Sequence, residues 1–113
     1  MVNMTWEDAI EVADAHEALD AVEANVSSQQ LTLRTAEGGL FTLGSRFWKA
    51  VGTKLVREYP NHDITVIVDA GEDAGIAMGA IADGHRAIRF TGEQETFEKL
   101  EQVGKEHGCM VVR

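Results

Sequence analysis

The chain contains very little cysteine, proline and aromatic side chain: one Cys, one Pro and an aromatic share of 6% among 113 residues. A single cysteine excludes an intrachain disulfide, and a single proline excludes Pro-rich low complexity. No apolar run reaches the roughly 18 residues of a membrane-spanning helix, and residues 1–8 lack the basic start of a signal peptide. We therefore expect a cytoplasmic protein with no membrane partner and a single domain over residues 1–113.

Basic side chains are also scarce, with 10 Lys+Arg against 19 Asp+Glu, which gives a formal net charge of -9. The two signs are separated along the chain. Residues 1–30 hold seven acidic side chains and no Lys or Arg, whereas residues 31–60 hold five basic and two acidic ones. Because a negative surface repels phosphodiester backbones, the composition predicts no nucleic-acid partner.

Apolar periodicity predicts strands that alternate with helices. The unbroken run of branched side chains at residues 64–68 is typical of a strand buried on both faces, as in a parallel sheet. A helix beginning at residues 6–8 is an alternative to the first strand. The expected strands are residues 9–13, 31–34, 64–68, 87–90 and 109–112, and the expected helices are residues 14–24, 45–59, 71–83 and 91–107.

This order of elements predicts the α/β class: a single three-layer domain with a mainly parallel sheet of about five strands and helices on both faces. The segment 31–43 leaves an alternative open. After the turn signal Glu37-Gly38-Gly39, residues 40–43 form either the return strand of a hairpin or an apolar lid on a long loop. The hairpin would make the fold α+β.

In an open parallel sheet, ligands bind beyond the carboxyl ends of the strands, where loops and helix N-termini converge at a switch point. Asp69 directly follows the strand 64–68 and is the candidate catalytic base; its structural alternative is a helix-cap or turn carboxylate. Asp14, Ser45 and Thr91 also fit helix N-caps. The candidate ligand-binding residues under this rule are Asp14, Ser45, Asp69, Gly71, Thr91 and Gly92.

Three glycines, Gly71, Gly75 and Gly79, follow one another at one-turn spacing in the expected helix 71–83. Since glycine costs ~1 kcal/mol against alanine inside a helix, this ridge indicates close helix-on-sheet packing or a ligand lying against the backbone. The glycine spacings match neither the P-loop nor the dinucleotide fingerprint, and no histidine pairs with Cys109 at a ligand spacing. The sequence therefore predicts no metal site, no cofactor and a buried, unreactive Cys109.

The helix expected at residues 45–59 separates its side chains into two faces. Apolar residues, among them Trp48, occupy one side. The opposite side carries a basic stripe that consists of Arg46, Lys49, Lys54 and Arg57. Docking of this basic stripe on the acidic first helix of a second copy would give a homo-oligomer whose association weakens with salt.

Parts of the chain resemble two known families. Residues 66–69 at the end of the third strand, with Asp14 after the first and Thr91 after the fourth, look like the phosphoacceptor, metal-binding and switch positions of receiver domains. Only one acid follows the first strand, where receiver domains have a pair. Residues 66–90 are similar to a βαβ segment of TIM-barrel aldolases and isomerases, which implies geometry and no activity.

A broader pattern runs through nearly the whole chain. It consists of Asp14-Ala15-x-x-Ala18-Leu19, Leu31-Thr32-Leu33, Phe47-Trp48, Pro60, Val68-Asp69-Ala70-Gly71 and Gly75-Ile76-Ala77. The pattern resembles a group of small bacterial α/β proteins that have no assigned function. The resemblance implies the α/β fold and a bacterial cytoplasm, and it implies no chemistry.

No catalytic constellation is evident in the sequence. This favours a non-catalytic ligand-binding or interaction module, with a small anionic molecule as the ligand. One alternative is a small lyase- or isomerase-like enzyme in which Asp69 acts as a base on an anionic substrate at the carboxyl ends of the strands. The other alternative is a degenerate receiver-like regulatory domain.

Overall fold

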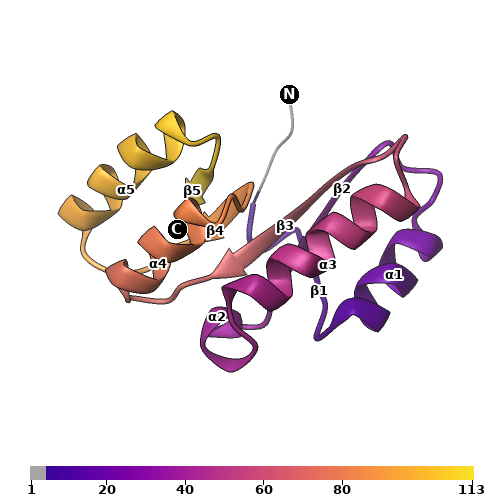
Figure 1. Ribbon diagram of the computed structural model, residues 1–113, viewed down its shortest axis with the longest axis horizontal. Coiled ribbons are helices and arrows are strands. Elements are labelled where there is room, and N and C mark those ends of the chain that lie inside the picture. Colours follow the sequence, from indigo (N-terminus) through magenta and orange to yellow (C-terminus); the bar gives the residue numbers. More distant parts are fainter. Residues whose placement is uncertain (1–4) are drawn as a thin grey trace.

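β3 (Asp63–Asp69) is the central strand of a five-stranded sheet in the computed structural model, which describes residues 5–113 (Figure 1). Every neighbouring pair of strands is parallel, and the strand order in the sheet is β1-β2-β3-β4-β5. The predicted α/β domain with a parallel sheet of five strands is therefore confirmed. The other strands are β1 (Ile10–Glu11), β2 (Gln30–Arg34), β4 (Ala87–Arg89) and β5 (Met110–Val112).

Each connection between strands contains a helix. The helices are α1 (Ala15–Ala24), α2 (Gly39–Thr42), α3 (Ser45–Glu58), α4 (Ala74–Ala82) and α5 (Gln94–Glu106). Asp14 is the N-cap of α1, as predicted, and its carboxylate accepts a hydrogen bond from the backbone N–H of Glu17 at 2.9 Å. Within residues 5–113, none of these helices has the length and apolar character needed to cross a membrane.

The segment that follows β2 is a short helix and a loop. Residues 39–42 form α2, and β2 pairs in parallel with both β1 and β3. A hairpin would require β2 to have an antiparallel partner. The α+β alternative with a hairpin at residues 31–43 is therefore wrong.

The strand order places the four longer helices on one face of the sheet. Strands that are adjacent in sequence are adjacent in the sheet, and right-handed crossovers that always step the same way put every connecting helix on the same side. Ala18 of α1, Leu55 of α3, Ile81 of α4 and Leu100 of α5 accordingly lie in one apolar cluster. The sheet contributes Leu33, Ile64, Val68, Ile88 and Val111 to this cluster, which is the main core.

A short segment before β1 covers the opposite face of the sheet. Trp6 and Ala9 pack there against Ile67, Ala87 and Val112. Residues 6–8 form a turn, so the alternative of a helix beginning at these residues is wrong. A short N-terminal segment therefore covers this face of the sheet. The sequence pattern predicts helices on this face as well.

This strand order contains no switch point, because the order never reverses direction along the sheet. A switch point opens a crevice since the two flanking helices lie on opposite faces of the sheet. Here the connecting helices share one face, so the topology supplies no such crevice at the carboxyl ends of the strands. A binding site in this fold therefore depends on hollows that the side chains form.

The glycine ridge of α4 does not contact the sheet. Gly75 and Gly79 are both exposed, and a Cβ built on Gly79 would meet no atom within 4 Å. Gly71 precedes α4, whose N-cap is Asp73, and has a positive φ of 57° that favours glycine. The prediction that this ridge permits close helix-on-sheet packing is therefore wrong.

Candidate functional site

Asp69 ends β3 with a buried carboxylate that organises the loops around it. The residue is 2% exposed. The backbone N–H of Gly38 donates to Oδ2 at 2.6 Å, and that of Gly71 donates to Oδ1 at 3.2 Å. Nη1 of Arg89 lies 3.7 Å from Oδ1. Both oxygens thus have partners inside the chain, which is the arrangement of a turn carboxylate.

The predicted residues that follow β4 also hold the loops together. The backbone N–H of Thr91 donates to the carbonyl of Gly71 at 2.8 Å, so the two loops are joined. Thr91 is not a helix N-cap, contrary to the sequence-based prediction, because α5 begins later with Glu93 as its N-cap. A Cβ on Gly92 would overlap the ring of Phe90, so packing alone requires glycine there.

A charged cluster on the sheet face that Trp6 covers has no counterpart among the sequence-based predictions. The guanidinium carbons of Arg34 and Arg89 lie 4.4 and 4.5 Å from the centre of the Trp6 ring. Arg34 also pairs with Glu11 at 3.1 Å, and Arg89 reaches Glu37 at 3.8 Å. The sequence did contain a signal for this cluster. Each arginine is the last residue of a strand and lies one residue from an apolar core position.

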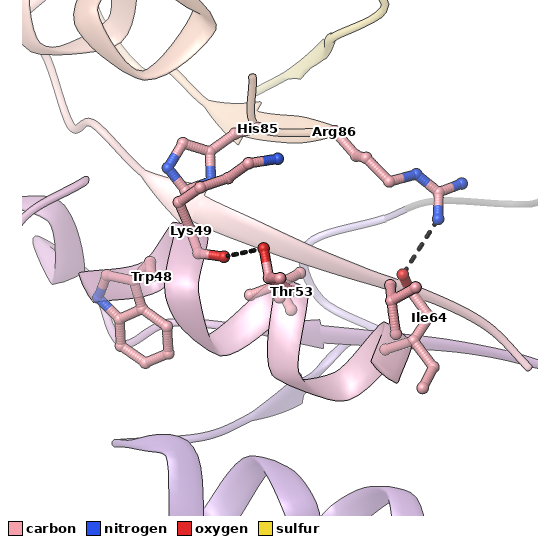
Figure 2. Close-up of a pocket in the computed structure, with 9 residues that line it drawn as sticks. Trp48, Lys49, Thr53, Ile64, His85 and Arg86 are labelled. Atoms are coloured by element: carbon pink, nitrogen blue, oxygen red, sulfur yellow. Dashed lines mark hydrogen bonds between the residues drawn. The ribbon is translucent and has the colours of Figure 1, made fainter. Parts of the chain in front are cut away.

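A groove lies beside α3, between that helix, the first half of β3 and the segment before β4 (Figure 2). The longer helices pack in two pairs, α1 with α3 and α4 with α5 (Figure 1). The groove borders α3 on the side of the segment that joins α4 to β4, which contributes His85 and Arg86. Its volume is about 210 Å³. The lining is apolar at Trp48, Val56, Ile64 and Val66 and polar at Lys49, Thr53, His85 and Arg86, with Gly52 between them.

Gly52 keeps one wall of this groove free of a side chain. It lies inside α3, where glycine costs roughly 0.5–1 kcal/mol relative to alanine. A Cβ built on Gly52 would meet no atom within 4 Å, so packing of the chain itself does not demand glycine. The absence of a side chain here leaves room for a bound molecule.

Two cations border the groove from its two sides. Lys49 is on α3, and its Nζ donates to the carbonyl of Gly84 at 2.9 Å. Arg86 precedes β4, and its Nη1 donates to Oδ1 of Asp63 at 2.9 Å and to the carbonyl of Ile64 at 3.1 Å. Figure 2 shows both side chains at the edge of the hollow, together with the hydroxyl of Thr53. The Thr53 hydroxyl donates to the carbonyl of Lys49 at 3.0 Å. Lys49 and Arg86 thus place two positive side chains at the rim, and Asp63 pairs with Arg86.

His85 lies at the inner end of the groove beside Ser45. The histidine is 5% exposed, and its Nε2 lies 2.9 Å from Oγ and 3.0 Å from the carbonyl oxygen of Ser45. Burial lowers the pKa of His85, and the nearby charge of Lys49 lowers it further, so the ring is neutral at pH 7. Ser45 is the first residue of α3, and the N-cap is Gly44, so the prediction of Ser45 as the N-cap is wrong.

The predicted basic stripe runs along the exposed side of α3. The structure brings its four members together around one shallow depression, which Ala50, Thr53 and Glu58 also line. Lys49 and Thr53 belong to the depression and to the groove, so the two hollows are continuous. Among the salt bridges within residues 5–113, none includes a member of the stripe.

Cys109 is shielded from solvent. Cys109 is buried, as predicted, and burial raises the pKa of its thiol to about 11, so the thiol stays protonated near neutral pH. In the part of the chain that the structure describes, no three His, Cys, Asp or Glu side chains are grouped to hold a metal ion.

Comparison with known proteins adds no relative. No protein-family model matches the chain, and no curated protein matches it significantly.

Proposed function

We propose that the protein is a non-catalytic binding module and that its site is the groove beside α3. The ligand is a small anion with an apolar body, such as an aromatic carboxylate, sulfonate or phosphate. The observation that carries this proposal is the combination of an apolar hollow, a cationic rim and a glycine inside the helix that forms one wall.

The apolar walls and the cationic rim have separate tasks. Val56, Ile64 and Val66 remove the ligand's apolar surface from water, which contributes about 25 cal/mol per Å² buried. Lys49 and Arg86 attract the anionic group and donate hydrogen bonds to it. The hollow of about 210 Å³ is smaller than drug-sized sites, so we expect a ligand of one or two rings.

The arrangement of polar groups supports binding over catalysis. Ser45 and His85 are within hydrogen-bond distance, but Ser45 does not line the groove, and the lowered pKa of His85 weakens it as a base. Asp69, the base of the lyase-like alternative, accepts backbone hydrogen bonds at both oxygens. The lyase-like alternative therefore gains no support from these contacts.

Titration with three naphthalene probes tests the ligand class. Naphthalene-2-sulfonate is anionic, 2-naphthylmethanol is neutral and 2-naphthylmethylammonium is cationic, while the ring system is the same. We expect the sulfonate to bind with at least tenfold higher affinity than the alcohol in isothermal titration calorimetry, and the ammonium probe to bind least. Equal affinities for the three probes would contradict the proposed anionic ligand.

Filling the groove tests its location. Gly52→Leu places a branched side chain in the hollow, so we expect it to abolish sulfonate binding. Gly79→Leu is the matched control, because Gly79 is also a helix-interior glycine without neighbours and does not line the groove. Sulfonate binding that survives Gly52→Leu would place the site elsewhere.

A further inference from the structure

The outward faces of two neighbouring helices carry opposite charge. α1 exposes Glu17, Asp20 and Glu23 and contains no Lys or Arg. The exposed side of α3 carries Arg46, Lys54 and Arg57, with the small side chain of Ala50 between them. α1 and α3 pack beside each other in the helix layer (Figure 1). An acidic strip and a basic strip therefore lie side by side on one surface. The basic strip is the basic stripe without Lys49, which borders the groove.

The chain leaves most of these charges available. Asp20 pairs with the exposed His16 at 3.3 Å, and Glu17 accepts the backbone N–H of Ala13 at 3.1 Å. No salt bridge within residues 5–113 joins α1 to α3 or includes Arg46, Lys54 or Arg57. The basic strip also borders a shallow depression on the surface of α3. These exposed charges are therefore available to a second molecule of complementary charge.

The geometry points to a second copy of this chain as that molecule. Both helices follow parallel strands and run in the same direction. A two-fold axis that lies in the interface plane, parallel to the two helices and midway between them, then places α1 of each copy across α3 of the other, with the two helices running in the same direction. Each half of the interface joins acid to base, whereas any shift that places α3 on α3 joins like charges. Arg46 and Arg57 are about 16 Å apart along the helix axis, so the strip can span the acidic turns of α1.

We propose that the protein forms a symmetric dimer in which α1 of each copy docks on the basic strip of the other. Arg46, Lys54 and Arg57 border the depression and do not line the groove, although the two hollows share Lys49 and Thr53. Charge changes at these three residues therefore test the dimer while the lining of the groove stays unchanged. Because the interface is electrostatic and solvent-exposed at its rim, salt screens it.

Charge reversal on each strip tests the dimer. The first variant is Arg46→Glu with Arg57→Glu, and the second is Asp20→Lys with Glu23→Lys. In sedimentation velocity at 20 mM salt, we expect the wild-type chain to be dimeric and each variant alone to be monomeric. An equimolar mixture of the two variants restores both halves of the interface, so we expect it to sediment as a dimer. At 500 mM salt the wild-type dissociation constant should rise roughly tenfold or more.

A chain that carries all four reversals restores complementarity within one variant, and it should dimerise again. The control is Lys99→Glu with Lys105→Glu on α5, which changes the same number of charges away from both strips and should leave the dimer intact. Circular dichroism checks that each variant is folded. If a variant with two reversals unfolds, the oligomeric states of the wild type and of the four-reversal chain still test the dimer. A wild-type monomer at low salt and millimolar concentration, or a mixture that stays monomeric, would overturn the proposal.

Discussion

At the carboxyl ends of β2, β3 and β4, charged side chains contact one another, whereas beside α3 they border an open hollow. The carboxylate of Asp69 accepts two backbone hydrogen bonds and lies 3.7 Å from Arg89, which also lies against Trp6. Lys49 and Arg86 each use one or two donors within the chain and keep others at the rim of the groove. A high density of charge is therefore not enough to make a binding site, because hydrogen-bond donors must remain free for a ligand.

Removal of the Asp69 carboxylate gives the largest effect that this comparison predicts. Asp69→Ala leaves Arg89 without this partner and frees the backbone N–H groups of Gly38 and Gly71. We expect the free energy of unfolding, measured with urea, to fall by about 3 kcal/mol.

Asp83→Ala is the control for Asp69→Ala, since Asp83 is an exposed residue at the end of α4, and we expect a change within about 0.5 kcal/mol. Folded Asp69→Ala protein should bind naphthalene-2-sulfonate as the wild type does. A stable Asp69→Ala variant that has lost the sulfonate would instead make the carboxyl edge the site.

Reversal of the rim charge gives the next largest effect. Lys49→Glu replaces a cation at the groove with an anion, so we expect the affinity for naphthalene-2-sulfonate to fall at least tenfold, or about 1.4 kcal/mol. Calorimetric titration measures this change. Lys99→Glu on α5 reverses another exposed lysine that does not line the groove and should leave the affinity unchanged. Equal losses in the two variants would indicate a general charge effect.

Substitution of the two helix-interior glycines separates stability from binding. Gly52→Ala and Gly79→Ala should each raise the free energy of unfolding by about 0.5–1 kcal/mol, because neither Cβ meets an atom within 4 Å. Thermal unfolding measures the gain. We expect only Gly52→Ala to weaken sulfonate binding as well. A destabilised Gly52→Ala variant would mean that Gly52 serves the fold.

The titration of His85 gives the smallest effect. Its pKa in the folded chain lies below the ordinary value of 6.5, mainly because the ring is buried. As the pH falls through about 6.5, the unfolded chain therefore takes up a proton at His85 before the folded chain does, and the free energy of unfolding decreases. Urea unfolding between pH 7.5 and 5.5 should show this decrease, and His85→Gln should show a shallower one. An identical pH dependence in the variant would contradict the buried, neutral ring.

The parallel sheet and most helices could be predicted from the sequence because each depends on local periodicity. Residues 64–68 show the branched run of a central strand, and Asp14 with Glu17 shows a capped helix start. The ends of elements were less predictable. Thr91 has the right side chain for an N-cap, but its backbone N–H joins the loop of Gly71 instead. A cap depends on the path of the chain, which sequence spacing does not reveal.

The groove could not be predicted from sequence periodicity, since its lining comes from distant parts of the chain. Lys49 on α3 meets His85 and Arg86, which precede β4, and the hollow exists because the helices pack in two pairs. Strand order was not predictable from local pattern either, and it removed the switch point on which the choice of carboxyl-end residues depended. One local signal did exist: Gly52 is a glycine in the middle of an otherwise strong amphipathic helix.

Chemical-shift mapping tests the central claim most directly. A ¹H–¹⁵N spectrum of the labelled chain is followed while naphthalene-2-sulfonate is added. If the groove is the site, residues 49–56, 64–66 and 84–86 show shifts that saturate, and residues 36–39, 69–72 and 89–93 are unchanged. Shifts concentrated in the latter three segments would contradict this location, because they would place the open site at the carboxyl ends of the strands.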